Sequence, residues 1–447
     1  MERQGGFQQQ KPYTEVELDP NSRFLFKLFR RYYRSFTPDM PDRFTKKEYG
    51  FIPFGKTMQR HMAFSGPDDL KNFMMSKVPA HSYYSTAYYR HPAKPVMEEK
   101  EWMGAELIFD LDADHLAGAE EMTYSQMMVQ IRKEMISLVD DFLCSDLGFS
   151  EKQVRICFSG GRGYHAHIRT NDIYTLGTNE RRELVDYVSC IGLDLDTVFP
   201  IHTDAVSVSM AANGMTRSNT HSYRVIPPAD SGGWDLKMRE ALKLICQNII
   251  ENDPKVIKAV YPSVKATPQT LENLRTRLKG LFRTMFERNT MNGLSNPEQD
   301  ILMKALNDVA PLLSSEVDKP VTPDIKRQIR LPGSLHGKTG LKVVHITRDE
   351  LTDYDPLQSA VPDVYTDDPV KLTMRKPMDL YMMGQHMSLK GETEVPEFAA
   401  PLLIAGNTPA TGGNRRGRNA CSDDPFLNII PATFINKVQI VPAQVYL

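Results

Sequence analysis

The sequence lacks the features that mark membrane, secreted and disulfide-stabilised proteins. None of its apolar runs approaches the ~20 residues that a membrane-spanning helix needs. The N-terminal stretch MERQGGFQQQK has no apolar segment typical of a secretory signal. Its five cysteines include no CxxC pair, which argues against a disulfide framework and against a cysteine zinc site. We therefore expect a cytoplasmic protein that does not associate with membranes.

The sequence also has almost no net charge, with 54 basic and 56 acidic residues giving −2. Net charge therefore does not by itself indicate nucleic acid as a partner. Two segments, 23–36 and 274–288, are nonetheless both basic and aromatic, a combination that can contact phosphate. A solvated helix face beside an apolar one explains each segment equally well.

The 447 residues are too many for one ordinary core. We expect a helical subdomain at 226–315, inserted between two parts of an α/β core, 21–225 and 316–402. We expect a flexible N-terminus over 1–20 and a disordered tail over 403–447, since both are poor in apolar patterning. Periodicity predicts helices over 21–36 (capped by Asn21 or Ser22), 123–147 (begun by a capping box of Thr123 and Gln126), 181–190, 235–252 and 269–290. It predicts strands over 48–55, 104–112, 154–158, 164–168, 325–331 and 341–347.

The segment ELIFDLDADH, residues 106–115, joins an apolar strand to a group of acids. Side chains alternate along a strand, so Asp110 and Asp112 share one face. Two neighbouring carboxylates repel each other unless a cation neutralises them, and Mg²⁺ or Mn²⁺ takes carboxylate oxygens well. The pattern predicts a metal site at the end of the strand, whereas a solvent-exposed strand end is the alternative.

The segment FSGGRGYHAH, residues 158–167, gathers hydrogen-bond donors around a glycine turn that joins two strands. Glycine lets the backbone approach a ligand closely. Arg162 offers a planar fork for phosphate oxygens, and Ser159 and His165 add further donors. We interpret the turn as a phosphate-binding site, and a hairpin with polar decoration is the alternative.

Two other groupings could bind metal by residue type alone. Asp194 and Asp196 repeat the spacing of two, but no strand leads into them, so we do not expect them to be catalytic. His165 and His167 share a strand face, but no third ligand is spaced nearby. We therefore rank metal binding by the two histidines below phosphate binding.

The segment VDKPVTPDIKRQIRLPGSLHGKTG, residues 317–340, offers a third carboxylate in Asp318. Cations and donors follow around its turn residues in Arg330, His336 and Lys338. A basic surface loop is the alternative for this segment alone. Three carboxylates together with such donors are what nucleotide transfer from a triphosphate requires, because the acids hold metal and the basic groups hold phosphates.

These three motifs, in this order, resemble the small catalytic subunit of archaeal and eukaryotic DNA primases over about residues 20–402. The resemblance implies the archaeo-eukaryotic primase fold, an α/β core of mixed sheets flanked by helices with a smaller helical lobe. It implies a nucleotidyltransferase that makes short RNA, or DNA, primers de novo for DNA replication. Its substrates would be nucleoside triphosphates on a single-stranded DNA template, with Mg²⁺ or Mn²⁺ as cofactor.

The resemblance also implies a partner and a setting. The partner would be a large subunit that carries an iron–sulfur cluster, and we expect no cluster in this chain. The setting would be an archaeal cytoplasm, in association with the nucleoid.

The same resemblance assigns roles to individual residues. Asp110, Asp112 and Asp318 would be the catalytic, metal-binding acids, and the hydrophobic–Asp pattern favours Asp318 over nearby Asp324. The nucleotide- and triphosphate-binding residues would be Ser159, Arg162, His165, Arg330, His336 and Lys338. Glu48 and Arg60, from the EYGFIPFG … RH segment, would lie near the initiation site.

The sequence departs from the family in one respect, and it leaves two alternatives to the primase function. Many relatives carry a Cys/His zinc knuckle between the first two motifs, but here only His115 and Cys144 could ligate, so we expect no structural zinc. FDLD also resembles the nucleophile motif of haloacid-dehalogenase-type phosphatases, although Asp114 stands where that motif usually has Thr or Val. A non-catalytic nucleic-acid-binding subunit would not need three matched acids.

Overall fold

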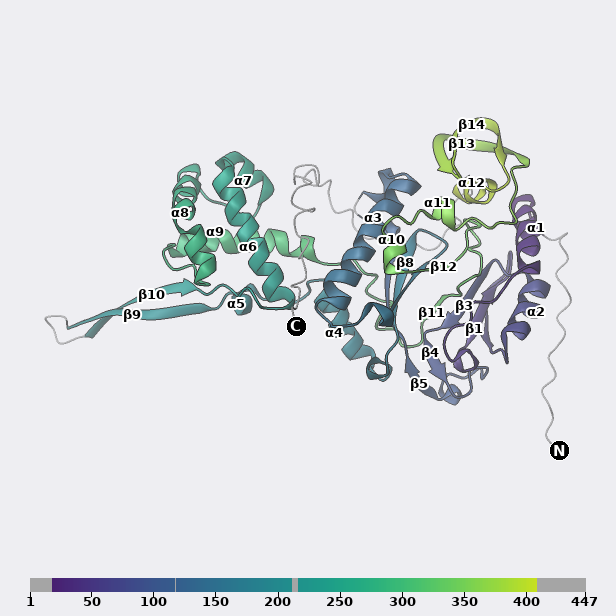
Figure 1. The fold of residues 1–447 in the computed structure, drawn as a ribbon, viewed down its shortest axis with the longest axis horizontal. Helices are drawn as coiled ribbons and strands as arrows, with labels where there is room; N and C mark the ends of the chain where they lie inside the picture. The colour runs from purple at the N-terminus through teal and green to yellow at the C-terminus, as the bar shows by residue number, and fades with distance from the viewer. Residues whose placement is uncertain (1–17, 117, 211–215, 408–447) are drawn as a thin grey trace. The chain divides into compact units, whose positions relative to one another are not determined.

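The computed structural model, drawn as a ribbon in Figure 1, describes residues 18–116, 118–210 and 216–407. These residues form two compact units. The first unit contains the described residues up to Val139, then Phe149–Val185 and the residues from Glu316 onward. The second unit contains Asp140–Gly148 and Asp186–Ser315.

The first unit is built around a four-stranded antiparallel sheet. In spatial order its strands are β12 (Val344–Ile346), β7 (Val154–Phe158), β8 (Gly163–Ile168) and β6 (Leu107–Asp112). β7 and β8 form the predicted hairpin, and every residue of β8 is buried. Helix α3 (Tyr124–Ser137) packs on β6 and β8 and begins with the predicted capping box of Thr123 and Gln126.

A second antiparallel sheet of this unit carries the other segments that reach the candidate site. In spatial order its strands are β11 (Gln328–Arg330), β3 (His81–Ser85), β1 (Tyr49–Ile52) and β2 (Gln59–Met62). Phe51 of β1 packs on Phe73 of helix α2 (Pro67–Lys77), with 4.5 Å between ring centroids. The mixture of helices and antiparallel sheets confirms the predicted α/β class.

Helix α1 (Pro20–Arg34) begins with a different cap from the predicted one. The Asp19 carboxylate accepts hydrogen bonds from the amides of Asn21 and Ser22, at 3.0 and 3.1 Å. Asp19 is therefore the N-cap, and the prediction of Asn21 or Ser22 in that role was wrong. A flexible N-terminus was expected over residues 1–20, but Asp19 and Pro20 already belong to the start of α1; residues 1–17 lie outside the described residues.

The strand expected over 104–112 is interrupted at Glu106, so the prediction of one continuous strand was wrong. β5 (Trp102–Ala105) pairs with β4 (Ala87–Tyr89), whereas β6 begins after the interruption and pairs with β8. The Glu106 carboxylate lies in the core, where it accepts a hydrogen bond from Lys47 Nζ at 2.7 Å. Both side chains are fully buried.

Further partners satisfy the polar groups at this interruption. The Arg181 guanidinium donates to the carbonyls of Ala105 and Glu106, at 2.7 Å each. His167 Nδ1 and Arg169 Nε lie 3.2 and 3.4 Å from Glu106 Oε2. Because a buried charge costs several kcal/mol unless it is paired, this network fixes where β5 ends and where β6 begins.

The C-terminal part of the first unit contains elements that were not predicted. They are the short helices α10 (Arg348–Leu351) and α11 (Pro356–Ser359) and the hairpin of β13 (Pro369–Met382) and β14 (Gln385–Pro396). Helix α12 (Ala400–Asn407) packs on β13 and buries Leu403. The disordered tail expected from residue 403 was therefore wrong at its start, and residues 408–447 lie outside the described residues.

The second unit combines helices with a long hairpin. Its helices α5 (Leu195–Val198), α6 (Gly233–Glu251), α7 (Pro254–Val260), α8 (Pro268–Glu287) and α9 (Asn296–Val309) follow α4 (Thr178–Val188) in the chain. α6 packs against α8 and α9. The hairpin of β9 (Ile201–Met210) and β10 (Thr216–Arg224) was not predicted. Because this hairpin belongs to the second unit, the expected start of the helical subdomain at 226 was too late.

The basic and aromatic segment 274–288 lies in α8 and the turn after it, where Leu274 and Leu278 are buried. Its arginines Arg275, Arg277 and Arg283 form ion pairs with Glu272, Glu298 and Glu287 respectively. These pairs favour the interpretation as a solvated helix face.

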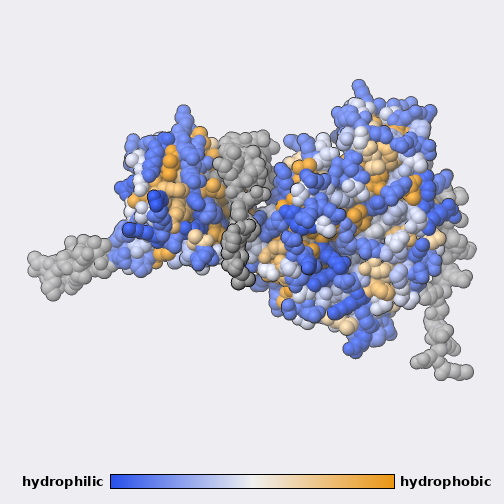
Figure 2. All heavy atoms as spheres, in the orientation of Figure 1, coloured by the Kyte–Doolittle hydropathy of each residue, from blue (hydrophilic) through white to orange (hydrophobic). Residues whose placement is uncertain are grey.

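The face of the protein drawn in Figure 2 is largely hydrophilic, with apolar residues in small groups. Within the described ranges, every helix is too short or too polar to cross a bilayer.

Replacing Glu106 by Gln should destabilise the first unit strongly, because Lys47 and Arg169 would remain buried without their counter-charge. We expect the free energy of unfolding to fall by about 3–5 kcal/mol. The chain has two tryptophans, and Trp102 is the first residue of β5, the strand that ends at the interruption. Urea unfolding followed by Trp102 fluorescence, in a Trp234→Phe background, therefore reports on this unit alone.

The matched control is Glu394→Gln, which removes the carboxylate of an exposed ion pair in the same unit. Lys371 and Glu394 are 87% and 59% exposed, so this change should cost no more than about 0.5 kcal/mol. Equal effects of the two substitutions would contradict the importance of the buried pair.

Candidate active site

The three predicted acids come together at the free edge of β6. This strand lies at the end of its sheet, and the segment that contains Asp318 runs along it. The Asp318 amide donates to the Asp110 carbonyl at 2.7 Å, and Thr322 Oγ1 donates to the Ile108 carbonyl at 2.6 Å. These bonds bring Asp318 beside Asp110 and Asp112, although it is far away in the sequence.

Electrostatics shows that the three carboxylates act on one another. Burial, together with the charges of Asp112 and Asp318, raises the pKa of Asp110 to about 7, against the lowering effect of Arg327 and Arg330. Mutual repulsion of this kind is relieved by a bound cation. An all-oxygen donor set fits a hard divalent ion such as Mg²⁺ or Mn²⁺.

The acids are nevertheless not arranged as a closed metal site. Among the described residues, no three histidine, cysteine, aspartate and glutamate side chains are grouped so that they could hold a metal ion between them. The open arrangement is consistent with a metal whose remaining ligands come from a substrate, since Mg²⁺ is commonly bound by one or two carboxylates together with phosphates.

The glycine turn of residues 159–163 lies between β6 and the loop that contains His336. Gly160 has a φ of +74°, and a Cβ there would lie 2.8 Å from His336 Cβ. A Cβ on Gly163 would lie 2.2 Å from the Leu111 carbonyl oxygen. Only glycine allows both approaches. Gly160 thus brings the second motif against the third, and Gly163 brings it against the first.

The two histidines of β8 have different partners. His165 Nε2 lies 3.4 Å from Asp110 Oδ1, whereas His167 contacts Glu106, the residue just before β6. Burial lowers the pKa of His165 well below its usual range, and His167 and Arg330 lower it further. His165 is therefore neutral beside the acids, and the contacts of His167 give no support to a shared metal site.

Arg162 lies at the exposed end of the turn and is already paired. Its Nη2 donates to Asp114 Oδ2 at 2.6 Å, and both side chains are about half exposed. The Asp114 amide in turn donates to Asp112 Oδ1 at 3.2 Å. Asp114 thus links the guanidinium to the acids, a contact that the sequence pattern did not indicate.

Two residues of the third motif, Arg330 and His336, lie near the acids and the glycine turn respectively. The charge of Arg330 acts on Asp110, and the charges of Asp110 and Asp112 act on Arg330. His336 is buried, and its Nδ1 lies 3.2 Å from Thr339 Oγ1, which donates to the Gly160 carbonyl. Lys338 is exposed.

Comparison with known proteins identifies the family of the chain. The family model for the DNA primase small subunit matches residues 109–348, more than half of the chain. The chain belongs to the DNA primase small-subunit family. Membership confirms the predicted family, the α/β fold class and the class of enzyme, and primases of this family are generally metal-dependent.

Individual relatives extend the similarity over nearly the whole length. A DNA primase small subunit PriS from Methanocella arvoryzae is 37% identical over 408 residues, which cover 86% of this chain and 97% of the relative. That of Methanococcoides burtonii is 36% identical over 389 residues, covering 85% and 96%. That of Picrophilus torridus is 34% identical over 376 residues, covering 84% and 94%.

The pair that the primase resemblance places near the initiation site lies at the second sheet, where Glu48 directly precedes β1 and Arg60 is in β2. Glu48 is fully buried and accepts hydrogen bonds from Arg60 Nε at 3.1 Å and Nη2 at 3.3 Å. Lys100 Nζ, which is also buried, lies 3.4 Å from Glu48 Oε2. In the part of the chain that the structure describes, the hydrogen bonds and ion pairs of Glu48 and Arg60 do not reach the three acids.

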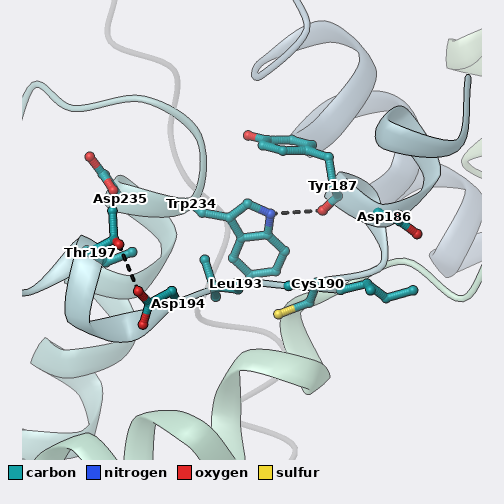
Figure 3. Close-up of a pocket in the computed structure, with 11 residues that line it drawn as sticks. Asp186, Tyr187, Cys190, Leu193, Asp194, Thr197, Trp234 and Asp235 are labelled. Atoms are coloured by element: carbon teal, nitrogen blue, oxygen red, sulfur yellow. Dashed lines mark hydrogen bonds between the residues drawn. The ribbon is translucent and has the colours of Figure 1, made fainter. Parts of the chain in front are cut away.

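The pocket in Figure 3 lies in the second unit and contains none of the predicted primase site residues. Trp234 forms part of its wall and donates to the Tyr187 carbonyl at 2.9 Å. Asp194 accepts from Thr197 Oγ1 at 2.8 Å and caps helix α5, and Asp196 pairs with Arg224. The carboxylates of Asp194 and Asp196 thus both have structural partners.

Proposed function

We propose that this chain is the catalytic primase subunit and makes primers by nucleotidyl transfer on single-stranded DNA. In each step the 3′ hydroxyl of one nucleotide attacks the α-phosphorus of a nucleoside triphosphate, a new phosphodiester bond forms, and pyrophosphate leaves. The observation that carries the proposal is the Asp318–Asp110 backbone hydrogen bond, because it brings the third acid beside the other two.

Asp110, Asp112 and Asp318 would hold Mg²⁺ or Mn²⁺. The metal, when bound, would neutralise the triphosphate and make the attacking hydroxyl more reactive. The mutual repulsion of the acids supports this role, since it disfavours three charged carboxylates without a cation. His165, which is neutral and has a single N–H, would donate to a phosphate oxygen from its place beside Asp110.

The basic residues would hold the triphosphate and the departing pyrophosphate. Ser159 and Arg162 lie on the glycine turn, and Arg330, His336 and Lys338 lie on the segment packed against it. Donors fixed in place before the reaction stabilise developing negative charge without reorganisation. The close packing of Gly160 on His336 supports a single cradle formed by both segments.

The remaining parts of the proposal concern partners and setting. The relatives are named as small subunits, which supports a large-subunit partner. We propose that this partner carries the iron–sulfur cluster and that this chain carries none. Glu48 and Arg60 would act at initiation, and no structural zinc would form from His115 or Cys144. The named relatives are archaeal, which supports the cytoplasm of an archaeal cell. No observation favours a phosphatase or a non-catalytic scaffold.

Asp318→Asn should reduce primer synthesis by at least about a hundredfold, because a metal ligand contributes several kcal/mol to the transition state. The measurement is formation of labelled oligonucleotides from nucleoside triphosphates on single-stranded DNA with Mn²⁺. Asp324→Asn is the matched control, since Asp324 is an exposed acid of the same segment. A variant Asp318→Asn that keeps near-normal synthesis would show that the metal acids are wrongly assigned.

Asp114→Asn should lower the KM for nucleoside triphosphate, because Arg162 would no longer be held by a competing carboxylate. An exposed ion pair is worth about 0.2–1 kcal/mol, so we expect a decrease of up to about fivefold. Arg162→Ala should raise the KM. In the Arg162→Ala background, Asp114→Asn should have no further effect, and a decrease there would contradict the competition.

A further inference from the structure

His81 has no place in any sequence motif, yet it contacts two parts of the third motif. It lies in β3, which pairs with β11 so that Arg330 is opposite Tyr83, and the two strands lie side by side in Figure 1. His81 Nδ1 accepts hydrogen bonds from Arg330 Nη1 at 2.5 Å and from the Gly337 amide at 3.2 Å. One nitrogen atom thus connects the strand to the loop that follows it.

The surroundings of His81 restrict both of these partners. Tyr83, two residues along the same face of β3, lies under the Arg330 guanidinium, 4.6 Å from ring centroid to Cζ. The rings of His81 and His336 meet edge to face, with centroids 5.0 Å apart. A Cβ on Gly337 would lie 2.7 Å from His81 Nε2, so this loop passes directly over the ring.

His81 is held in the neutral form. Burial, together with the charges of Arg330 and Lys338, lowers the pKa of His81 to about 3. Because Nδ1 accepts both hydrogen bonds, the single proton of the neutral ring is on Nε2. The contact with Arg330 is therefore a hydrogen bond from a cation to an uncharged acceptor.

We propose that His81 is a positioning residue for the triphosphate: its Nδ1 fixes the Arg330 guanidinium and the Gly337 amide together, so that Arg330 and His336 are presented to the same phosphate groups. The inference rests on the proposed function, in which Arg330 holds the triphosphate. It adds a residue that touches neither the substrate nor the acids and acts through Arg330.

The neutral acceptor explains why histidine suits this position. A carboxylate would hold the guanidinium equally well, but it would cancel the positive charge that attracts the triphosphate, as ion pairing does. An apolar side chain would leave the charge but release the guanidinium. Only an uncharged acceptor orients Arg330 and keeps its full charge available for phosphate.

Three substitutions separate these effects. His81→Ala removes the acceptor, His81→Asn restores an uncharged acceptor, and His81→Asp restores an acceptor with negative charge. In the full chain, we expect the KM for nucleoside triphosphate to rise about tenfold in His81→Ala and in His81→Asp. We expect it to stay within about threefold of the original value in His81→Asn, with kcat less affected than KM throughout.

Binding can be measured without turnover by titrating ATP and Mn²⁺ into each variant and following heat release. The dissociation constants should follow the order found for the KM values. His91→Asn is the matched control, since His91 is an exposed histidine of the same unit, with its side chain 50% exposed. Thermal unfolding of each variant shows whether the fold is retained, and rescue by Asn excludes a purely steric role.

A double-mutant cycle with Arg330→Ala identifies the route of action. Arg330→Ala alone should raise the KM at least tenfold, and adding His81→Ala should change it by less than about twofold. An impaired Arg330→Ala with a normal His81→Ala would overturn the role of His81 and leave the proposed function standing. A normal Arg330→Ala would instead overturn the triphosphate role of Arg330. Equal binding by His81→Asp and His81→Asn would overturn the argument from charge.

Discussion

The buried ion pair between Lys47 and Glu106 is the constraint on which the site depends. Burial alone would raise the pKa of Glu106, but Lys47, the hydrogen bond with His167 and Arg169 hold it well below its usual range. The charged carboxylate can be accommodated only where these cations converge, and the chain therefore leaves one sheet and enters another at this residue. β6 is thereby fixed against β8, with Asp110 and Asp112 at its end.

The basic and aromatic segment 23–36 has a structural role in the same unit. It lies largely in α1, where Tyr32 donates to the Gly333 carbonyl at 2.7 Å and Tyr33 Oη accepts from the Leu335 amide at 3.2 Å. The helix thus supports the loop that leads to His336. Its aromatic residues form a structural support for the phosphate-binding segment, which favours the solvated-face interpretation of the sequence pattern.

The predictions from sequence were most accurate where the cause is local. The capping box at Thr123, the hairpin around the glycine turn and the strand that ends at Asp112 each depend on neighbouring residues, and each is present. The errors arose where a distant partner decides the outcome. In the sequence, Glu106 is only one polar residue in an apolar run. The strand is interrupted there because Lys47, which lies just before β1, forms a buried ion pair with Glu106.

The sequence by itself determined the kinds of group available: carboxylates at a strand end, donors around a glycine turn, and cations near a second turn. Those residue types also determined the family. Only the tertiary structure decided which of them meet, because Asp318 reaches Asp110 through a backbone hydrogen bond that has no local sequence signal. The same holds for His81, whose neutrality and two donors come from side chains and backbone that folding brings to it.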